Sequence, residues 1–133
     1  MKRLALLSLI VLLNGCAIVD IYRQAKWDNN EYALANEIQT QAVLGADKCG
    51  TKKVLPYVDT IYVKSVEFKN YTSDIQRNAE TQKMSEELLA ITKGLKERYY
   101  SGDEVSQKYC ELKFTTIQTS TGTIKQALGA KPR

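Results

Sequence analysis

The chain has 133 residues, enough for one domain with a modest core, and carries 19 Lys and Arg against 15 Asp and Glu. It contains no histidine, which excludes Ser-His-Asp and Cys-His catalysis and removes the commonest metal ligand. Positive and negative charges are interspersed, so the sequence lacks the strongly basic face of a nucleic-acid-binding protein, and we expect no nucleic-acid partner.

The first fifteen residues have the layout of a secretory signal. Residues 1–3 are Met, Lys and Arg, residues 4–13 are almost entirely apolar, and residues 14–15 are Asn and Gly. The apolar run is shorter than the roughly 20 residues that a membrane-spanning helix needs. We therefore expect residues 1–15 to be a removed signal peptide and residues 16–133 to form a single mature domain.

The end of this leader, Leu13-Asn14-Gly15-Cys16, resembles the lipobox of bacterial lipoproteins. The resemblance implies that the Cys16 thiol takes a diacylglycerol before cleavage and that the freed amine is often acylated too. Two or more acyl chains give stable anchoring. In Gram-negative bacteria an aspartate after the cysteine is similar to an inner-membrane retention signal, so Ala17 implies the outer membrane and a domain that faces the periplasm. An ordinary secretory signal with an incidental cysteine is the alternative.

The two other cysteines, Cys49 and Cys110, are predicted to pair. An exported chain meets an oxidising compartment, where two leftover cysteines most simply form a disulfide. The closed loop of 62 residues would contribute about 4 kcal/mol in the chain-entropy model. Two free thiols are the alternative. A metal site is disfavoured because two thiolates without histidine leave the usual ligand set incomplete, and we expect no cofactor.

The first segment with helical periodicity runs from about Val19 to Leu44. Trp27, Leu34 and Ile38 lie at helical spacing along it. Gly45 follows where a C-terminal cap is expected, so we predict that this helix ends there.

The second segment runs from about Lys52 to Asn70, and its buried stripe is predicted from 4-3-4-3 spacing at Val54, Val58, Ile61, Ser65 and Phe68. Its Val, Tyr and Thr residues favour a strand. Pro56 fits poorly beyond a first turn that begins near Thr51. We therefore expect the helix to begin nearer Pro56 or to be kinked there.

The third segment is predicted to begin near Ser73, because residues 73–76 resemble a capping box, and to end near Tyr100. Its predicted stripe has 4-3-4 spacing and consists of Met84, Leu88, Ile91 and Leu95. Gly94 lies inside and should cost about 1 kcal/mol relative to alanine. Close approach of a neighbouring backbone is the simplest explanation for it.

The fourth segment is predicted to begin with a second capping box at residues 101–104. Its stripe is the longest in the chain and consists of Cys110, Phe114, Ile117, Thr121, Ile124 and Leu128. A strand with alternating Cys110, Leu112 and Phe114 is the competing interpretation, and the longer period favours the helix. Residues after Gly129 are expected to fray.

The predicted disulfide restricts the topology. If the second and third segments formed one straight helix over residues 52–100, it would span roughly 70 Å and separate the two cysteines, whereas a disulfide needs Cα atoms within about 7 Å. An all-α, up-down-up-down four-helix bundle brings Cys49 and Cys110 together at the end away from the lipid. A kinked helical hairpin or three-helix arrangement is the alternative.

Three aromatic residues are candidate partner contacts. Tyr99 and Tyr100, beside Gly102, could form a patch at the membrane-distal end, since tyrosine suits interfaces. Packing in the core or at the bundle edge is the more ordinary role. For Trp27 we favour the core over a partner contact.

Catalysis by a pair of carboxylates is formally open, with Asp28, Glu31, Glu86 and Glu87 available. A solvated helix face is the simpler interpretation of these residues. We therefore expect no catalytic residues and no metal site.

Together these features predict a non-enzymatic, outer-membrane-anchored module that binds or assembles an envelope protein partner. Its general features look like those of small helical lipoproteins such as the pilotins of type II secretion, which bind a secretin tail; this is an analogy of fold that covers no specific motif. A phage-encoded lipoprotein acting in exclusion or lysis fits equally well. Weaker alternatives are a carboxylate-dependent cell-wall enzyme and a peptidoglycan tether. The tether is disfavoured because Arg133 stands where the murein lipoprotein ends in lysine.

Overall fold

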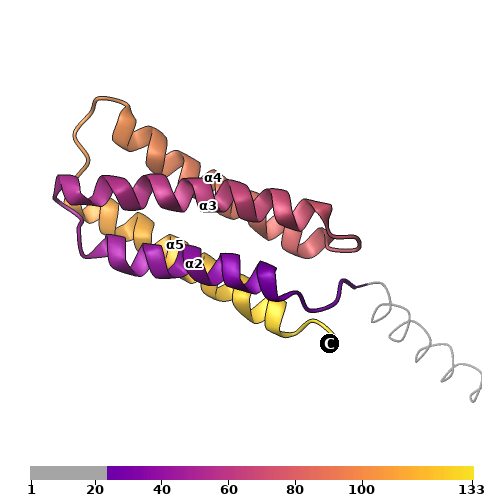
Figure 1. The fold of residues 1–133 in the computed structure, drawn as a ribbon. Coiled ribbons are helices and arrows are strands. Elements are labelled where there is room, and N and C mark those ends of the chain that lie inside the picture. The colour runs from indigo at the N-terminus through magenta and orange to yellow at the C-terminus, as the bar shows by residue number, and fades with distance from the viewer. Residues whose placement is uncertain (1–23) are drawn as a thin grey trace, which may run out of the picture.

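A computed structural model describes residues 24–133, so the signal segment, Cys16, Ala17 and the predicted helix start at Val19 lie outside the described residues. The described chain is all-helical, with four long helices packed antiparallel (Figure 1). The elements in chain order are α2 (Asn29–Ala46), the 3-10 helix η1 (Lys52–Val54), α3 (Leu55–Asp74), α4 (Ala79–Tyr100) and α5 (Gln107–Gly129). The predicted four-helix bundle is confirmed, and the chain turns at residues 75–78 instead of forming one long helix.

The four helices form a closed ring of neighbours, in which α2 and α4 each pack against both α3 and α5. The connections α2–α3 and α4–α5 lie at one end of the bundle, which we call the disulfide end (residues 47–54 and 101–106). The α3–α4 turn, the start of α2 and the C-terminal tail lie at the other, which we call the turn end (residues 24–28, 75–78 and 130–133) (Figure 1). None of the helices in the described part has the length and apolarity needed to cross a membrane.

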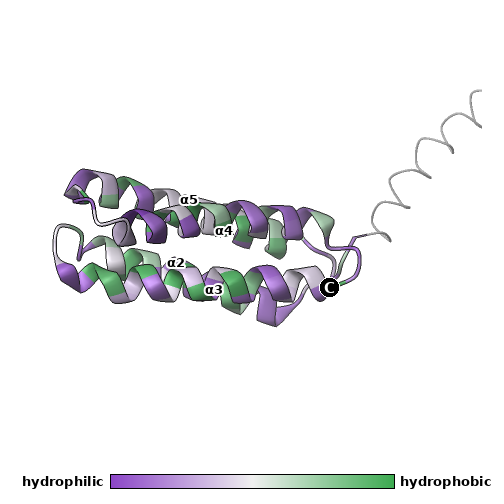
Figure 2. Ribbon diagram, turned by 90° about the horizontal axis from the view of Figure 1, so that it is seen from above, coloured by the Kyte–Doolittle hydropathy of each residue, from purple (hydrophilic) through white to green (hydrophobic). Residues whose placement is uncertain are grey.

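The core is built from one stripe on each helix, and hydrophobic and hydrophilic residues alternate along the helices (Figure 2). Every predicted stripe position of the second and fourth segments is buried. The largest of these side chains, Phe68 and Phe114, are fully buried, and burial of such a side chain contributes about 1.5–3 kcal/mol. Pro56 lies in the first turn of α3, as predicted, where its missing N–H removes no helical hydrogen bond.

The predicted stripe of α4 is only half right. Met84 and Ile91 are half-buried at the edge of the helix. Their places in the core are taken by hydroxyl residues, and the buried positions of α4 are Thr81, Ser85, Leu88, Thr92 and Leu95. Ser85 and Thr72 share a hydrogen bond of 3.0 Å between helices. Hydroxyl groups can occupy a core when their hydrogen bonds are made inside it, and apolar periodicity does not detect them.

Two predicted helix starts are wrong, and the helix predicted from about Val19 to Leu44 is not helical at residues 24–28, because other residues cap the helices. Asp28 caps α2 by accepting hydrogen bonds from two backbone amides, so the helix begins at Asn29 and Trp27 precedes it. Ser73 lies in the last turn of α3 and donates to the Lys69 carbonyl instead of capping α4. Ser106 caps α5, so the proposed capping box at residues 101–104 is part of the preceding loop.

Two glycines have roles opposite to those predicted. Gly45 does not cap α2 but lies inside it, where an added Cβ would be 2.5 Å from Phe114 Cε1 and 2.8 Å from Tyr57 Cβ. Its missing side chain lets α3 and α5 approach α2. An added Cβ on Gly94 would meet no atom within 4 Å, so the predicted close backbone approach at Gly94 is wrong.

Candidate binding surfaces at the two ends of the bundle

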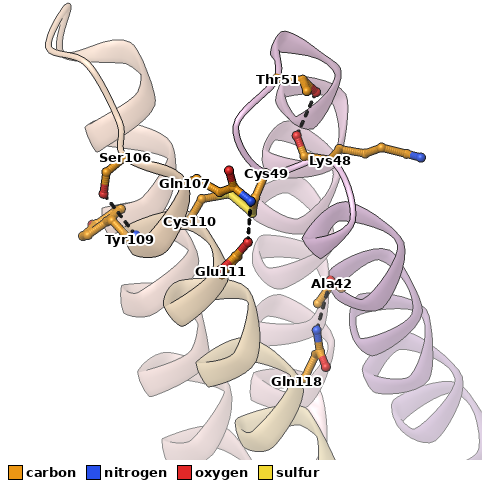
Figure 3. The surroundings of a disulfide bond; sticks show 10 residues. All are labelled: Ala42, Lys48, Cys49, Thr51, Ser106, Gln107, Tyr109, Cys110, Glu111 and Gln118. Atoms are coloured by element: carbon orange, nitrogen blue, oxygen red, sulfur yellow. Dashed lines mark hydrogen bonds between the residues drawn. A yellow bond between two sulfur atoms is a disulfide. The ribbon is translucent and has the colours of Figure 1, made fainter.

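The disulfide joins the loop after α2 to the first turn of α5 (Figure 3). The Cα atoms of Cys49 and Cys110 are 5.7 Å apart, which confirms the predicted pairing. About two helical turns deeper, the Gln118 side chain donates to the Ala42 carbonyl at 3.2 Å and adds a second link between α2 and α5 (Figure 3). The disulfide end is therefore held by a covalent bond and by side-chain hydrogen bonds.

A pocket of about 380 Å³ opens at the disulfide end, between the α2–α3 connection and the α4–α5 loop. Its wall includes the apolar side chains of Val54, Leu55 and Val105, and its charged groups are Lys52, Asp103 and Glu104. Pockets that take small molecules or single side chains have volumes of about 300–1,000 Å³ and a similar mixture of apolar wall and a few polar groups. The composition of this pocket suits recognition of a side chain or short segment.

The α4–α5 loop that borders this pocket is fixed by Arg98. The Arg98 guanidinium forms an ion pair with Asp103 at 3.0 Å and donates to the Glu104 carbonyl at 3.3 Å. An exposed ion pair alone contributes little stability. Together, however, the ion pair and the hydrogen bond to the Glu104 carbonyl fix the path of the loop. The pocket is therefore preformed in the absence of a ligand.

Tyr99 lines the pocket at the disulfide end and packs against the core. Burial raises the pKa of its hydroxyl above the usual value of 10.0, and the nearby Tyr109 raises it further. The hydroxyl therefore stays neutral at physiological pH and can both donate and accept a hydrogen bond.

Tyr100 lies on a different surface, formed by α3 and α4. Its hydroxyl donates to Asp59 at 2.7 Å. The Lys96 ammonium lies 3.3 Å from the same carboxylate and over the rings of Tyr62 and Tyr100, at 4.7 and 5.6 Å from the centroids. Successive helical residues point about 100° apart, so Tyr99 and Tyr100 line two different surfaces and do not form the single patch that was considered beside ordinary packing.

Trp27 lies at the turn end, the opposite end from Tyr99. Its half-buried ring packs on Tyr32, with centroids 5.1 Å apart, and the Arg133 guanidinium lies 5.3 Å from its centroid. The indole N–H donates to Asn29 at 2.6 Å, and the backbone N–H donates to the Pro132 carbonyl at 2.8 Å. The three aromatic residues singled out from the sequence thus belong to three separate places.

The turn end also holds a buried polar network that the sequence analysis missed. The Lys131 ammonium lies 2.6 Å from Glu31 Oε2 and 2.6 Å from Asn78 Oδ1, and the Asn78 amide donates to both Glu31 Oε1 and the Thr72 carbonyl. The tail that was expected to fray is therefore held in place. A signal existed in the sequence, because Glu31 extends the buried 4-3-4-3 stripe of α2 by one turn beyond Ala35.

The four carboxylates considered for catalysis have four different surroundings. Asp28 caps α2 and accepts from the Tyr71 hydroxyl, and Glu31 is buried in the network above. Glu86 accepts from Gln82 one turn earlier. Glu87 lines a groove of about 180 Å³ between α4 and α5.

Neither a metal-binding cluster in the described residues nor a similarity to known proteins indicates a function. Within residues 24–133, no group of three or more Cys, Asp or Glu side chains is placed to hold a metal ion. The candidate lipidation residue, Cys16, lies outside the described residues. No protein-family model, curated protein or solved structure matches this chain.

Proposed function

We propose that this chain is a lipid-anchored, non-enzymatic module of the bacterial outer membrane that binds an envelope protein through the pocket at the disulfide end. Support for the anchor on Cys16 and for the location comes from the resemblance of residues 13–17 to a lipoprotein signal. The observation that carries the binding role is the pocket itself. It is open, apolar-walled and shaped in advance by the disulfide and by Arg98.

The path of the chain supports this orientation. The described chain enters the bundle at the turn end (Figure 1). Cys16 precedes Gln24 by eight residues, which span at most about 28 Å when extended. The 23 residues of α5 run for about 35 Å between the two ends. An acylated Cys16 would therefore hold the turn end near the bilayer and leave the pocket facing the periplasm.

The pocket defines the chemistry of the segment it would accept. An apolar side chain would pack on Leu55 and Val105, and the neutral Tyr99 hydroxyl would hydrogen-bond to a backbone group of that segment. A basic side chain would meet Glu104, an exposed acidic residue in the lining. Aromatic residues are enriched in the centre of protein interfaces, and Tyr99 is the aromatic residue in the lining of this pocket.

Site-specific photo-crosslinking in the native host tests the binding site. A photoreactive amino acid at Val105, in the pocket wall, is expected to give an adduct with one envelope protein. The matched control is Leu112, a 62% exposed apolar residue of α5 that does not line the pocket. Adducts at neither position, or at both equally, would contradict binding through this pocket.

A charge reversal gives a second test of the same surface. Glu104→Lys is expected to reduce the yield of the Val105 adduct, since it replaces the carboxylate proposed to meet a basic side chain. Lys108→Glu, at an exposed position of α5, is the control for a change of charge at the same end.

The anchor is tested separately by intact-mass spectrometry of the protein from its native envelope. The expected mass is that of residues 16–133 with two or three acyl chains. An unmodified chain would refute the anchor and leave the crosslinking result to stand on its own.

A further inference from the structure

The neighbouring helices α2 and α5 (Figure 1) share a surface on which the exposed side chains carry no charge. None of the exposed residues of α2 is charged, and neither is any exposed residue of α5 from Leu112 to Gly129. The exposed positions of α4, by contrast, include six charged residues, namely Glu80, Lys83, Glu86, Glu87, Lys93 and Glu97. Charge is therefore distributed unevenly around the bundle.

We call this surface the uncharged face. Its α2 half has 3-4-3 spacing, which places its members along one side of a helix, and consists of Ala33, Asn36, Thr40 and Val43. Its α5 half has 4-3-4 spacing and consists of Thr115, Thr119, Gly122 and Gln126. The halves adjoin, because an added Cβ on Gly122 would lie 3.4 Å from Gln39 Nε2 of α2.

Lys125 and Glu37, which border the uncharged face, are both engaged within the bundle. The Lys125 ammonium donates to the side-chain oxygens of Asn36 and Gln39, at 2.7 and 2.9 Å. Glu37 pairs with Lys64 of α3 at 3.3 Å. Charged residues are depleted in the centre of protein interfaces, and the uncharged face has this property from one end of α2 to the other.

The chemistry of the face suits a second copy of this chain. In a twofold contact the same surface lies on both sides, so a charged surface would meet its own charges. The amide groups of Asn36 and Gln126 can both donate and accept hydrogen bonds, so they can pair with their equals. Val43 adds an apolar side chain that is 50% exposed.

The size of the face also suits a dimer. The 18 residues of α2 span about 27 Å, and two helices side by side are about 20 Å wide. The face therefore covers roughly 500 Å² on each copy, by the same helix dimensions. A pair of such faces would bury about 1,000 Å², which reaches the size at which an interface becomes specific.

We propose that the uncharged face is the contact surface of a parallel dimer, in which two copies lie side by side and are related by a twofold axis along the bundle. The parallel arrangement rests on the proposed lipid anchor, which would hold the turn ends of both copies at one membrane and let their sides meet. No residue of the uncharged face lines the pocket at the disulfide end. The dimer would therefore present two open pockets to the periplasm.

Site-specific photo-crosslinking in the native membrane tests the contact. A photoreactive amino acid at Thr40 is expected to give an adduct with twice the mass of the chain, which distinguishes it from the envelope-protein adduct expected at Val105. The control is Ala90, an exposed residue of α4 that lies outside the face. An adduct of Thr40 with a different protein, no adduct, or equal self-adducts at both positions would overturn the proposal.

Charge variants test the twofold geometry. In the parallel dimer α2 of each copy lies opposite α5 of the other. Thr40 then faces Thr119 of the second copy, since Ala42 and Gln118 are level within one bundle. Thr40→Lys is expected to lower the association constant of the purified protein more than about tenfold, because it buries an unpaired charge. The control, Ala90→Lys, adds the same charge on α4 and should leave the association constant unchanged.

Mixing two variants gives a result that misfolding could not produce. Thr119→Glu alone should also weaken the dimer. A mixture of Thr40→Lys and Thr119→Glu chains should form heterodimers in preference to either homodimer, because the new ammonium faces the new carboxylate. Native mass spectrometry distinguishes these species by mass. Heterodimers no more abundant than the homodimers would overturn the parallel twofold arrangement, and the photo-crosslinking result does not depend on these variants.

The anchor and the dimer would fail in different ways. If the chain carries no acyl group and the Thr40 self-adduct forms, the anchor is wrong and the dimer stands. If the acylated protein gives no self-adduct at Thr40, the dimer is wrong and the anchor stands.

Discussion

The Lys131 ammonium lies 2.6 Å from a carboxylate oxygen of Glu31, although 100 residues separate them in the chain. The exposed fractions of the two side chains are 4% and 0%. Removing two charges from water is costly, and the cost is offset only when the pair is close and its other polar atoms are satisfied. Asn78 meets that requirement by bonding to both partners. The C-terminal tail is therefore part of the bundle.

Lys131→Ala is predicted to reduce the free energy of unfolding by about 3–5 kcal/mol, because it leaves the Glu31 carboxylate buried without its cation. Urea denaturation monitored by circular dichroism measures the change. The control is Glu31→Leu combined with Lys131→Met, which removes both charges and is expected to be neutral or stabilising. A loss below about 1 kcal/mol in the single variant, in the range of exposed ion pairs, would contradict a buried role.

The buried network was not predicted from the sequence, whereas much of the fold was. The stripes of α3 and α5 could be predicted because their spacing is carried by large side chains such as Phe68 and Phe114. The disulfide followed from counting cysteines, and its geometry correctly required the chain to turn back between the second and third segments. Glu31 was missed because a charged residue on a buried face has meaning only with its partner, and Lys131 lies at the far end of the chain.

The candidate surfaces were less predictable than the fold. Tyr99 and Tyr100 are adjacent in sequence, but the helical rotation sends one to the pocket at the disulfide end and the other to Asp59. The two predicted capping boxes were wrong for a related reason. Several serines and aspartates can cap a helix locally, and the tertiary contacts of the loop decide which one does, as for Ser106 in α5.

Gly45→Ala is predicted to lower the free energy of unfolding by about 1–3 kcal/mol. The added methyl would overlap the Phe114 ring and the Tyr57 Cβ, at 2.5 and 2.8 Å. The higher helix propensity of alanine would by itself stabilise the protein by up to about 1 kcal/mol. A net loss of stability would therefore show that the steric overlap outweighs the gain in helix propensity. Thermal unfolding gives the sign directly.

The matched control is Gly94→Ala, in the exposed interior of α4, where the new methyl meets nothing within 4 Å. This substitution should stabilise the protein by roughly 0.5–1 kcal/mol, since alanine loses less backbone entropy than glycine in a helix. The two substitutions are chemically identical and are predicted to have opposite signs. A loss of stability at Gly94 would mean that a neighbouring group approaches it after all.

Replacing Cys49 and Cys110 by serine is predicted to cost about 4 kcal/mol of stability in the chain-entropy model. The bond closes most of the described chain into one loop, because its ends are 61 residues apart in sequence. Such a loss is a large part of the 5–15 kcal/mol typical of a domain. Equal melting temperatures with and without reductant, in a protein shown to contain the bond, would contradict this prediction.

Tyr100 is predicted to ionise above the usual pKa of about 10. The main cause is its hydrogen bond to Asp59, and burial and the negative charge of that carboxylate raise the pKa further. A raised pKa means that the folded state holds the proton more tightly than the unfolded state. The stabilising contribution is therefore complete below about pH 10 and is lost as the pH rises through the pKa of the folded protein.

The difference in tyrosinate absorbance between the unmodified protein and Tyr100→Phe isolates this titration from those of the other tyrosines. Its midpoint should lie above 10, and in the Asp59→Asn background it should move down, because an amide removes both the charge and the strong acceptor. An unchanged midpoint in that background would show that Asp59 does not control the hydroxyl. In that case the contact of 2.7 Å between Tyr100 and Asp59 would not persist in solution, and the α3–α4 surface would present a free tyrosine hydroxyl to any partner.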